Sequence, residues 1–315
     1  MNKNIIKRIP VPTGDILIIQ GEFGKLECLS LGDYGKDVNL NQHKPVIHGP
    51  LLPLEEKWVI TISQSYGCPI GCAFCDVPKV GPGRNATLGD MVAQIAAARS
   101  LHMDVKHSKR LNVHFARMGE PTFNLDVLKL AEILRDLEEF NVHPVVSTMM
   151  PNSHHDLPWF LKEWMRIKNE VYEGNAGLQL SINSTDEQER DFMFNHKTCS
   201  LDGIGFLMKR LSPVGRKITL NFAVAGYTVD PNVLLKHFSP DKYICKLTPM
   251  HKTNSAVSAG IKTEGDYTSP EPYLELEEKL QRAGYETLVF IASAEEDESR
   301  ITCGNAILSQ EHENK

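Results

Sequence analysis

The 315-residue sequence lacks any apolar stretch long enough for a signal peptide or a membrane span. Its first residues, MNKNIIKRIPVPTGD, mix charged and polar residues with short apolar runs. We therefore expect a cytoplasmic protein with no membrane partner. The sequence also lacks internal repeats and low-complexity segments, so it shows no sign of a repeat architecture.

The sequence has no surplus of positive charge. It contains 34 Lys and Arg against 40 Asp and Glu, and its pI is near 6.1. This balance argues against broad, non-specific coating of nucleic acid. A local basic groove for RNA is compatible with it, and Lys106 to Arg110 (KHSKR), with Lys79 and Arg84, would supply one. The alternative for KHSKR is a solvated loop of mixed charge.

The cysteines do not have the pattern of a secreted disulfide framework. There are seven in the chain, and three of them lie within eight residues. In a reducing compartment such clustering favours a metal site.

The hydrophobic pattern predicts an α/β protein. Residues 1–55 contain short β-like pieces, which predict a small β-rich N-terminal extension. From Trp58 onward, strand-like runs alternate with amphipathic stretches, which predicts a parallel sheet with right-handed crossovers. We expect a partial (β/α)6 barrel over residues 56–308 and a flexible tail over 309–315, with the chemistry at the carboxyl ends of the strands.

The expected strands are WVITIS, LNVHFA, HPVVST, GLQLSI, KITLNFAV, YICKLT and ETLVFIA, and the expected helices cover residues 88–100, 125–140, 157–168, 201–211, 231–237 and 270–283.

Three cysteines, Cys68, Cys72 and Cys75, follow the first expected strand of the barrel in the run SYGCPIGCAFC. Their spacing allows three thiolates to hold three irons of a 4Fe-4S cubane, which leaves the fourth iron without a protein ligand. S-adenosylmethionine (SAM) can chelate that iron, and an electron from the reduced cluster can then cleave its sulfonium to a 5'-deoxyadenosyl radical. The alternative, a zinc knuckle, requires a fourth ligand, and none follows at a suitable spacing.

Further motifs follow the cysteine loop in a fixed order: Gly83-Arg84-Asn85, Met118-Gly119-Glu120-Pro121, Ser147-Thr148, Ser181-Ile182-Asn183, Leu247-Thr248-Pro249 and Thr302-Cys303-Gly304. With this ordered set the chain resembles the RlmN/Cfr-type radical SAM RNA adenine methyltransferases, from about Trp58 to Asn305. The resemblance implies an enzyme with a radical SAM barrel, a 4Fe-4S cluster and SAM as cofactors, and a flavodoxin-type electron donor. It also implies methylation of an adenine carbon in rRNA or tRNA.

The resemblance assigns the first part of the SAM pocket. Phe74 would cover the adenine of the cofactor, and packing in the core is its alternative role. Gly119 would allow close approach of the backbone, while Glu120 would accept hydrogen bonds from the ammonium group of the methionine moiety. A tight turn with a surface glutamate is the alternative for this pair.

Polar residues at later strand ends would complete the pocket. Ser147, Ser181 and Asn183 would bind the ribose and the carboxylate of SAM. Because Asp186 and Glu187 follow in the sequence, Ser181 and Asn183 are alternatively ordinary helix N-caps. His251 stands at the position that matches a cofactor-binding asparagine of the family, where it could donate a hydrogen bond or titrate.

Cys303 lies in the polar run SRITCGN after the last expected strand. A lone cysteine is usually a small buried hydrophobe. By resemblance, Cys303 is the methyl carrier: one SAM methylates its thiol, and a second supplies the radical that removes a hydrogen from that methyl group.

The chain departs from the family at the second catalytic cysteine, seven residues before the cysteine loop, where it has Thr61. A threonine hydroxyl is far less acidic than a thiol and forms no disulfide with Cys303. Another thiol would have to substitute, or the product leaves by another route. The candidates are Cys28, Cys199 and Cys245, each of which we expect to be structural.

Two other family features are missing from the sequence. The upstream acidic residue that serves the family as a proton acceptor has no counterpart in register, and His48 is the nearest titratable residue. We also expect the short N-terminal extension to lack the helical RNA-binding module of the ribosomal enzymes.

These departures leave two hypotheses open: RNA adenine methylation through Cys303, or radical chemistry on a small molecule or peptide, with Cys303 as hydrogen donor or relay. A non-catalytic iron-sulfur or zinc protein is a third reading, which the ordered cofactor motifs disfavour.

Overall fold

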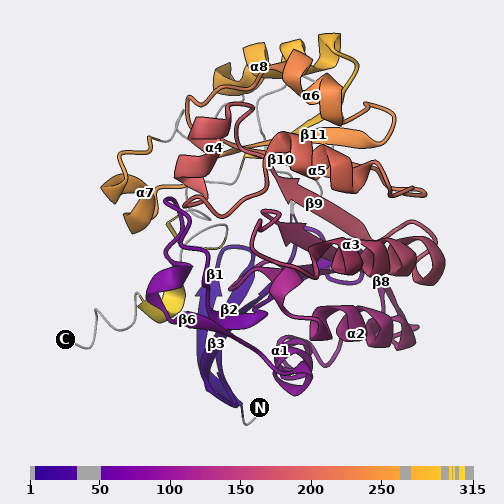
Figure 1. The fold of residues 1–315 in the computed structure, drawn as a ribbon. Coiled ribbons are helices and arrows are strands. Elements are labelled where there is room, and N and C mark those ends of the chain that lie inside the picture. Colours follow the sequence, from indigo (N-terminus) through magenta and orange to yellow (C-terminus); the bar gives the residue numbers. More distant parts are fainter. Residues whose placement is uncertain are drawn as a thin grey trace.

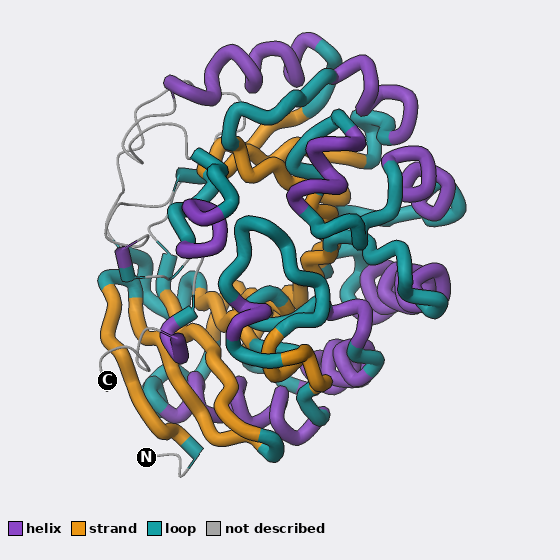
Figure 2. Tube along the Cα trace, turned by 60° about the vertical axis from the view of Figure 1, so that its left-hand side comes forward, coloured by secondary structure: helices purple, strands orange, loops and turns teal. Residues whose placement is uncertain are grey.

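The computed structural model describes residues 4–33, 51–262, 271–291, 298–299, 301 and 305–308. In these residues one long mixed sheet has the strand order β1-β2-β3-β4-β7-β8-β9-β10-β11-β12, and β5 pairs with β6 in a separate small sheet. Helices cover one face of the long sheet (Figure 1, Figure 2). The expected α/β architecture is confirmed, and the described strands form an open sheet, with no closing contact between β1 and β12.

The strands are β1 (Ile5–Val11), β2 (Gly14–Gly21), β3 (Gly24–Leu31), β4 (Trp58–Ile62), β5 (Ser65–Gly67), β6 (Pro82–Asn85), β7 (Ser108–Phe115), β8 (Phe140–Thr148), β9 (Gly177–Ser181), β10 (Ile218–Val224), β11 (Tyr243–Pro249) and β12 (Glu286–Val289). From β4 through β7 to β12 every neighbouring pair in the long sheet is parallel. This arrangement places the carboxyl ends of these strands along one edge.

The N-terminal strands extend the same sheet. β1, β2, β3 and β4 pair antiparallel in turn, and Leu29 of β3 lies opposite Thr61 of β4. The β-rich character expected for the first residues is therefore present in residues 4–33. Its sheet is continuous with the parallel strands.

The α-helices are α1 (Leu88–Ser100), α2 (Asp126–Ile133), α3 (Leu157–Arg166), α4 (Glu187–Met193), α5 (Leu201–Met208), α6 (Pro231–His237), α7 (Asn254–Ser258) and α8 (Glu271–Arg282). A capping box between Thr87 and Asp90 fixes the start of α1. None of the described helices has the length and the apolar character needed to cross a bilayer.

Three details differ from the sequence prediction. The helix expected to reach Phe140 ends at Ile133, because Phe140 pairs with Ser108 as the first residue of β8 and packs beside Trp58. Two short helices, α4 and α7, were not expected. The motif Gly83-Arg84-Asn85, which by the family resemblance should open the helix over residues 88–100, lies instead in β6.

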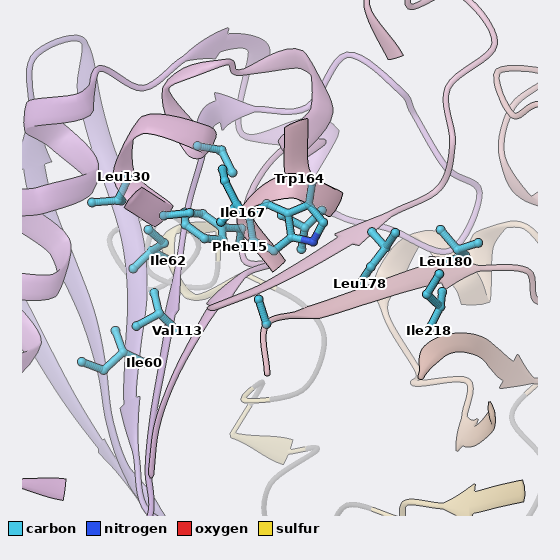
Figure 3. Packing of buried hydrophobic residues seen from close by; sticks show 14 of the residues in the cluster. Ile60, Ile62, Val113, Phe115, Leu130, Trp164, Ile167, Leu178, Leu180 and Ile218 are labelled. Atoms are coloured by element: carbon cyan, nitrogen blue, oxygen red, sulfur yellow. The ribbon is translucent and has the colours of Figure 1, made fainter. Parts of the chain in front are cut away.

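The main core lies between the long sheet and its helices. Figure 3 shows side chains of both layers in contact there: Ile60, Ile62, Val113, Phe115, Leu178, Leu180 and Ile218 from strands, with Leu130, Trp164 and Ile167 from the helical layer. Phe115 and Trp164 meet edge to face with their ring centroids 6.2 Å apart. The indole of Trp164 also donates to the Gly177 carbonyl at 3.1 Å, which ties α3 to β9.

The opposite face of the sheet, which we call the inner face, is more polar. Side chains alternate along a strand, so the neighbours of the core residues point to this face. Thr61, His114, Ser147, Ser181 and Asn221 are among them. The inner face therefore carries the polar strand residues of the candidate site.

Replacing Phe115 by alanine tests the core. The side chain is fully buried, and its loss leaves a cavity against Trp164. We expect Phe115→Ala to lower the free energy of unfolding by about 3–5 kcal/mol, measured by guanidinium denaturation. Phe206→Ala on α5 is the matched control, because Phe206 is 57% exposed, and it should change that free energy by about 0.5 kcal/mol or less. Equal effects would contradict this assignment of the core.

Candidate functional site

The three clustered cysteines lie on a loop that follows β5 and is held by glycines. Gly67 and Gly71 have φ angles of 86° and 78°, which favour glycine. A Cβ on Gly67 would stand 2.0 Å from the Gly81 carbonyl oxygen, so this position requires glycine. The loop turns at Cys72, whose carbonyl accepts from the amide of Cys75 at 3.0 Å.

Segments distant in the sequence fasten this loop. The side chains of Asn195 and Lys197, after α4, donate to the carbonyls of Ile70 and Pro69 at 3.0 and 2.6 Å. Asp76 accepts from the backbone amides of Asn254 and Ser255 at the start of α7. Both unexpected helices thus position the cysteine loop.

The cysteine loop shares a small hydrophobic cluster with the carboxyl ends of the strands. Cys68 and Cys72 pack there with residues that follow β8, β10 and β11 and with residues of α4 and α7, namely Met149, Ala225, Met250, Met193 and Ala256. The loop therefore lies at the strand edge where the sequence predicted chemistry.

The three thiols are close enough for their charges to interact. Burial raises the pKa of Cys68 to about 11 and raises that of Cys72 well above its usual value. The charges of Cys75, Cys68 and Glu120 act in the same direction on Cys72. A bound metal centre would reverse this preference, because it favours the thiolate.

The donor set fits an iron-sulfur cluster. Among the described residues, no three His, Cys, Asp or Glu side chains surround one point as ligands of a single metal ion. In a cubane the thiolates bind separate irons, so three sulfurs spread along one partly exposed loop suit it.

Gly119 and Glu120 form the turn after β7, next to the cysteine loop. Gly119 has a φ of 102°, and a Cβ there would stand 2.1 Å from the hydroxyl oxygen of Ser65. Glu120 is 6% exposed, so it is not the surface glutamate of the alternative prediction. Its carboxylate accepts from the Thr122 amide and hydroxyl at 3.2 and 2.9 Å and from the Met149 amide at 3.1 Å. Burial raises the pKa of Glu120, against these hydrogen bonds.

Ser147, Ser181 and Asn183 lie at neighbouring strand ends. Ser147 of β8 is in register with Gln179 of β9, so Ser147 and Ser181 share the inner face. Asn183 has a φ of 59° and accepts from the Ala223 amide at 3.0 Å. The N-cap of α4 is Asp186, so the alternative role of Ser181 and Asn183 as helix N-caps is wrong.

Phe74 and the segment that carries His251 are joined by one hydrogen bond: the backbone carbonyl of Phe74 accepts from the Thr253 hydroxyl at 2.6 Å. The ring of Phe74 meets the ring of Phe194 edge to face, with the centroids 5.8 Å apart. His251 lies two residues before Thr253 and is half-buried. Packing and cofactor contact are both compatible with the half-buried ring of Phe74.

Cys303 lies outside the described residues, but residues on both sides of it are held by a buried ion pair between Glu27 and Arg117. The guanidinium of Arg117 donates to Glu27 at 2.5 Å and to the Ile301 carbonyl at 3.0 Å. Glu27 also accepts from the amides of Ala306 and Ile307 at 2.7 and 3.2 Å. The segment that includes Cys303 thus begins and ends beside the turn that carries Glu120.

Sequence reasoning missed Glu27 as a buried acid near the site. The sequence offered no glutamate in the family register, and His48, the nearest residue, was more simply a surface histidine; it lies outside the described residues. The structure instead places Glu27 on β3, fully buried, beside β4 and Thr61. A glutamate in the apolar run LECLSL was the available signal, because an unpaired charge is rarely placed in a core.

None of the other described cysteines faces Thr61. Thr61 lies on the inner face, between Leu29 of β3 and His114 of β7. Cys28 and Cys245 are fully buried in the main core, as expected, and burial raises the pKa of Cys245 to about 12. Cys199 packs against the same core, where burial also raises its pKa.

The two basic segments do not form one groove, which agrees with the alternative of a solvated loop for KHSKR. Lys79 and Arg84 follow the carboxyl end of β4, whereas Lys106 to Arg110 lie at the start of the parallel strand β7, at the opposite end. Lys79 pairs with Asp76, and Arg84 stacks on Phe23.

The known proteins that are similar in sequence match only part of this chain. No protein-family model matches the chain. The dual-specificity RNA methyltransferase RlmN of Sulfurimonas denitrificans is 42% identical over 83 residues, 26% of this chain and 23% of that protein. RlmN of Nautilia profundicola is 31% identical over 138 residues, 44% of this chain and 36% of that protein. A probable RNA methyltransferase of Sorangium cellulosum is 26% identical over 181 residues, 57% of this chain and 43% of that protein.

This chain therefore spans less than half the length of each of these three relatives. Among solved structures, a radical SAM methyltransferase from Sphaerobacter thermophilus matches with a TM-score of 0.66 and 18% identity, over 95% of this chain and 80% of that one. This likeness shows a shared fold. The resemblance to RlmN/Cfr-type proteins that the motifs indicated is confirmed by the relatives found.

Gly119→Ala tests the turn beside the cysteine loop. The new Cβ would overlap the Ser65 hydroxyl and force alanine into a left-handed backbone conformation. We expect a loss of about 2–4 kcal/mol of unfolding free energy and less iron bound after anaerobic reconstitution. Gly89→Ala on α1, whose Cβ would lie 3.7 Å from its nearest neighbour, is the control. A Gly119→Ala protein as stable and as iron-loaded as this control would refute the tight contact.

Arg117→Met tests the buried ion pair. It leaves the Glu27 carboxylate uncompensated, so unfolding free energy should fall by about 3–5 kcal/mol. The double variant Glu27→Gln/Arg117→Met should lose less than the sum of the two single losses, because no charge is left unpaired. Denaturant unfolding of all four proteins gives the coupling energy. Strictly additive losses would show that the two side chains act independently.

Proposed function

We propose that this chain, which resembles the RlmN/Cfr-type proteins, is a radical SAM methyltransferase that modifies a carbon of adenine in RNA through Cys303. The observation that carries the proposal is the three-cysteine loop at the carboxyl ends of parallel strands. The loop lies beside the turn of Gly119 and Glu120 and beside the anchored segments that flank Cys303.

The cysteine loop would hold the cluster. Cys68, Cys72 and Cys75 would each bind one iron and leave the fourth iron for SAM. When bound, the cluster and SAM supply the one-electron reduction that yields the 5'-deoxyadenosyl radical. A flavodoxin-type donor would deliver the electron. The partial exposure of all three cysteines supports transfer from a docked partner.

Glu120 would bind the ammonium group of SAM. The hydrogen bonds to its carboxylate come from neutral groups of Thr122, Thr148 and Met149, so they orient it without cancelling its charge. A buried carboxylate gains most from a cation that approaches it. The ammonium group would supply that cation.

The remaining pocket residues would bind the rest of SAM. Ser147 and Ser181 share the inner face at adjacent strand ends and would contact the ribose and the carboxylate, with Asn183 and His251 beside them. Phe74 would lie against the adenine. These residues would hold SAM at the carboxyl ends of β8 to β11.

Cys303 would carry the methyl group to the substrate. Arg117 and Glu27 hold Ile301 and Ala306 on its two sides, which supports a fixed approach of this segment to the cofactor.

The proposed function also implies the domain organisation of the family. The parallel strands would form a partial (β/α)6 barrel over residues 56–308, after a β-rich extension over 1–55 and before a tail over 309–315.

Thr61 favours a second candidate function on a substrate other than RNA, with Cys303 as hydrogen donor or relay. The described cysteines outside the loop pack in the main core, and none is positioned to replace the missing family thiol on the inner face. Product release through a disulfide is therefore unsupported. For the RNA reaction, proton removal from the adduct would need another base.

The methyl carrier is tested by mass spectrometry. Protein purified anaerobically from a methylating host should carry one extra methyl group on the peptide with Cys303, and Cys303→Ala should lack it. Cys199→Ala is the matched control and should keep it. Unmodified Cys303 in cluster-loaded protein would favour the hydrogen-donor function.

The substrate is tested in the same cells. Digested RNA from cells with and without the protein should differ in methyladenosine, and Cys303→Ala should abolish the difference. Substitution of Cys68, Cys72 and Cys75 by alanine should abolish both 5'-deoxyadenosine formation and RNA methylation. Retained methylation in that triple variant would rule out the radical mechanism.

A further inference from the structure

Arginine, lysine and neutral histidine side chains gather on the inner face away from the cysteine loop. Arg110 and His114 lie on β7, His143 on β8 and Lys246 on β11, while Arg216 precedes β10. We call these residues the cationic patch.

The sheet register places the patch on one face. His114 pairs with Val145, which lies two residues beyond His143 and therefore points to the same side. Val145 pairs in turn with Gly177, where a Cβ would stand 3.0 Å from the Nη1 atom of Arg216. The side chain of Arg216 therefore reaches across the start of β9.

The remaining members lie on the same side. The Nε of Arg110 donates to the Asn112 side chain at 3.1 Å, and Asn112 alternates with Arg110 and His114 along β7. Lys246 is in register with Asn221, which is in register with Ser181. The patch thus extends from the amino ends of the strands to the residues proposed for the cofactor.

The described inner-face positions of β4 and β7 to β11 carry no Asp or Glu. On the flanking strands β3 and β12, Glu27 and Glu286 are paired with Arg117 and Lys217. The positive charges of Arg110 and Arg216 are therefore not balanced by a carboxylate of these strands.

The charges of the patch act on one another. Burial, together with the nearby cations Arg216, Lys246, Arg110 and Lys57, lowers the pKa of His114 to about 3. Burial lowers the pKa of His143 to about 4, again aided by Arg110 and Arg216. Both imidazoles are therefore neutral at pH 7. The ring of His143 is already hydrogen-bonded to the Asn175 backbone, whereas His114 can donate one N–H to an anion.

Arg216 shows that the patch is incomplete. Its Nη1 is buried and has no hydrogen-bond partner among the described residues. Buried polar groups are nearly always hydrogen-bonded, since an unmade bond costs free energy. An anion between Arg216 and Arg110 would complete the guanidinium and offset the like charges.

We propose that the cationic patch binds a phosphate group of the substrate. Planar guanidinium groups bind phosphate oxygens in pairs, and a lysine adds a point charge. The carboxylate of SAM is a poorer candidate, because His143 lies four residues before Ser147, about 13 Å along the strand. A phosphate held in the patch would leave the rest of the substrate to extend past Lys246 toward the cofactor.

The phosphate group would belong either to a nucleotide of RNA or to a small phosphorylated molecule. Its assignment to the substrate rests on the proposed function. Binding of the anion itself does not, because it needs neither cluster reduction nor methyl transfer.

Titration calorimetry of the full-length protein, at fixed ionic strength in chloride, tests the patch. The probes are inorganic phosphate, adenosine 5'-monophosphate and a short adenosine-containing oligoribonucleotide. At least one should bind, and Arg216→Gln should weaken its binding about tenfold or more through the lost paired hydrogen bonds. Arg210→Gln, which changes an exposed arginine outside the patch, is the matched control and should leave binding within about twofold.

Arg110→Gln provides an independent variant should Arg216→Gln unfold, and it should weaken binding in the same direction. Saturation by phosphate or the mononucleotide assigns the patch to a small phosphorylated group, whereas patch-dependent binding of the oligoribonucleotide alone assigns it to RNA. Absence of saturable binding by all three probes, or equal affinity in Arg216→Gln and Arg210→Gln, would overturn the proposal. Anion binding without any RNA methylation would instead count against the proposed function alone.

Discussion

The buried ion pair between Glu27 and Arg117 joins three parts of the protein that are far apart in the sequence. Glu27 belongs to β3, Arg117 begins the turn that carries Glu120, and both bind backbone groups at Ile301 and Ala306. A buried charge pair is stable only when its remaining hydrogen-bonding groups are satisfied. The amides and the carbonyl of the C-terminal segment supply those partners. The positions of Ile301 and Ala306 and the position of the turn therefore depend on the same pair.

Charge is distributed unevenly along the sheet. At the carboxyl ends of the strands, Glu120 places a negative charge beside the thiols of Cys68 and Cys72 and disfavours their ionisation. Toward the amino ends, Arg110 and Arg216 place positive charge on the inner face. A cationic centre is favoured at the first place and an anion at the second. One sheet thus presents two sites that favour bound groups of opposite charge.

The sequence predicted the local elements well where one signal dominated. Helix α1 matches its prediction because Thr87 and Asp90 cap it, and α6 matches because Asp230 caps a helix that begins at Pro231. The prediction was wrong for Phe140, which the sequence pattern placed at the end of a helix. Pairing with β7 and packing on Trp58 make it the first residue of β8 instead. Helix α4 was missed although Asp186 caps it, because its sequence EQERDFM has too few apolar residues to give a periodicity; contacts with the cysteine loop fix its position.

The sequence by itself determined the three-cysteine loop, the alternation of strands and helices, and the glycines that the tight turns need, because these depend on residue type and on spacing along the chain. It also located the polar residues at the strand ends. Only the tertiary structure decided that Glu27 pairs with Arg117, that Cys28 and Cys245 point away from Thr61, and that Arg216 joins Arg110 on one face. These outcomes depend on strand register and on burial, which set distances between residues that the sequence keeps far apart.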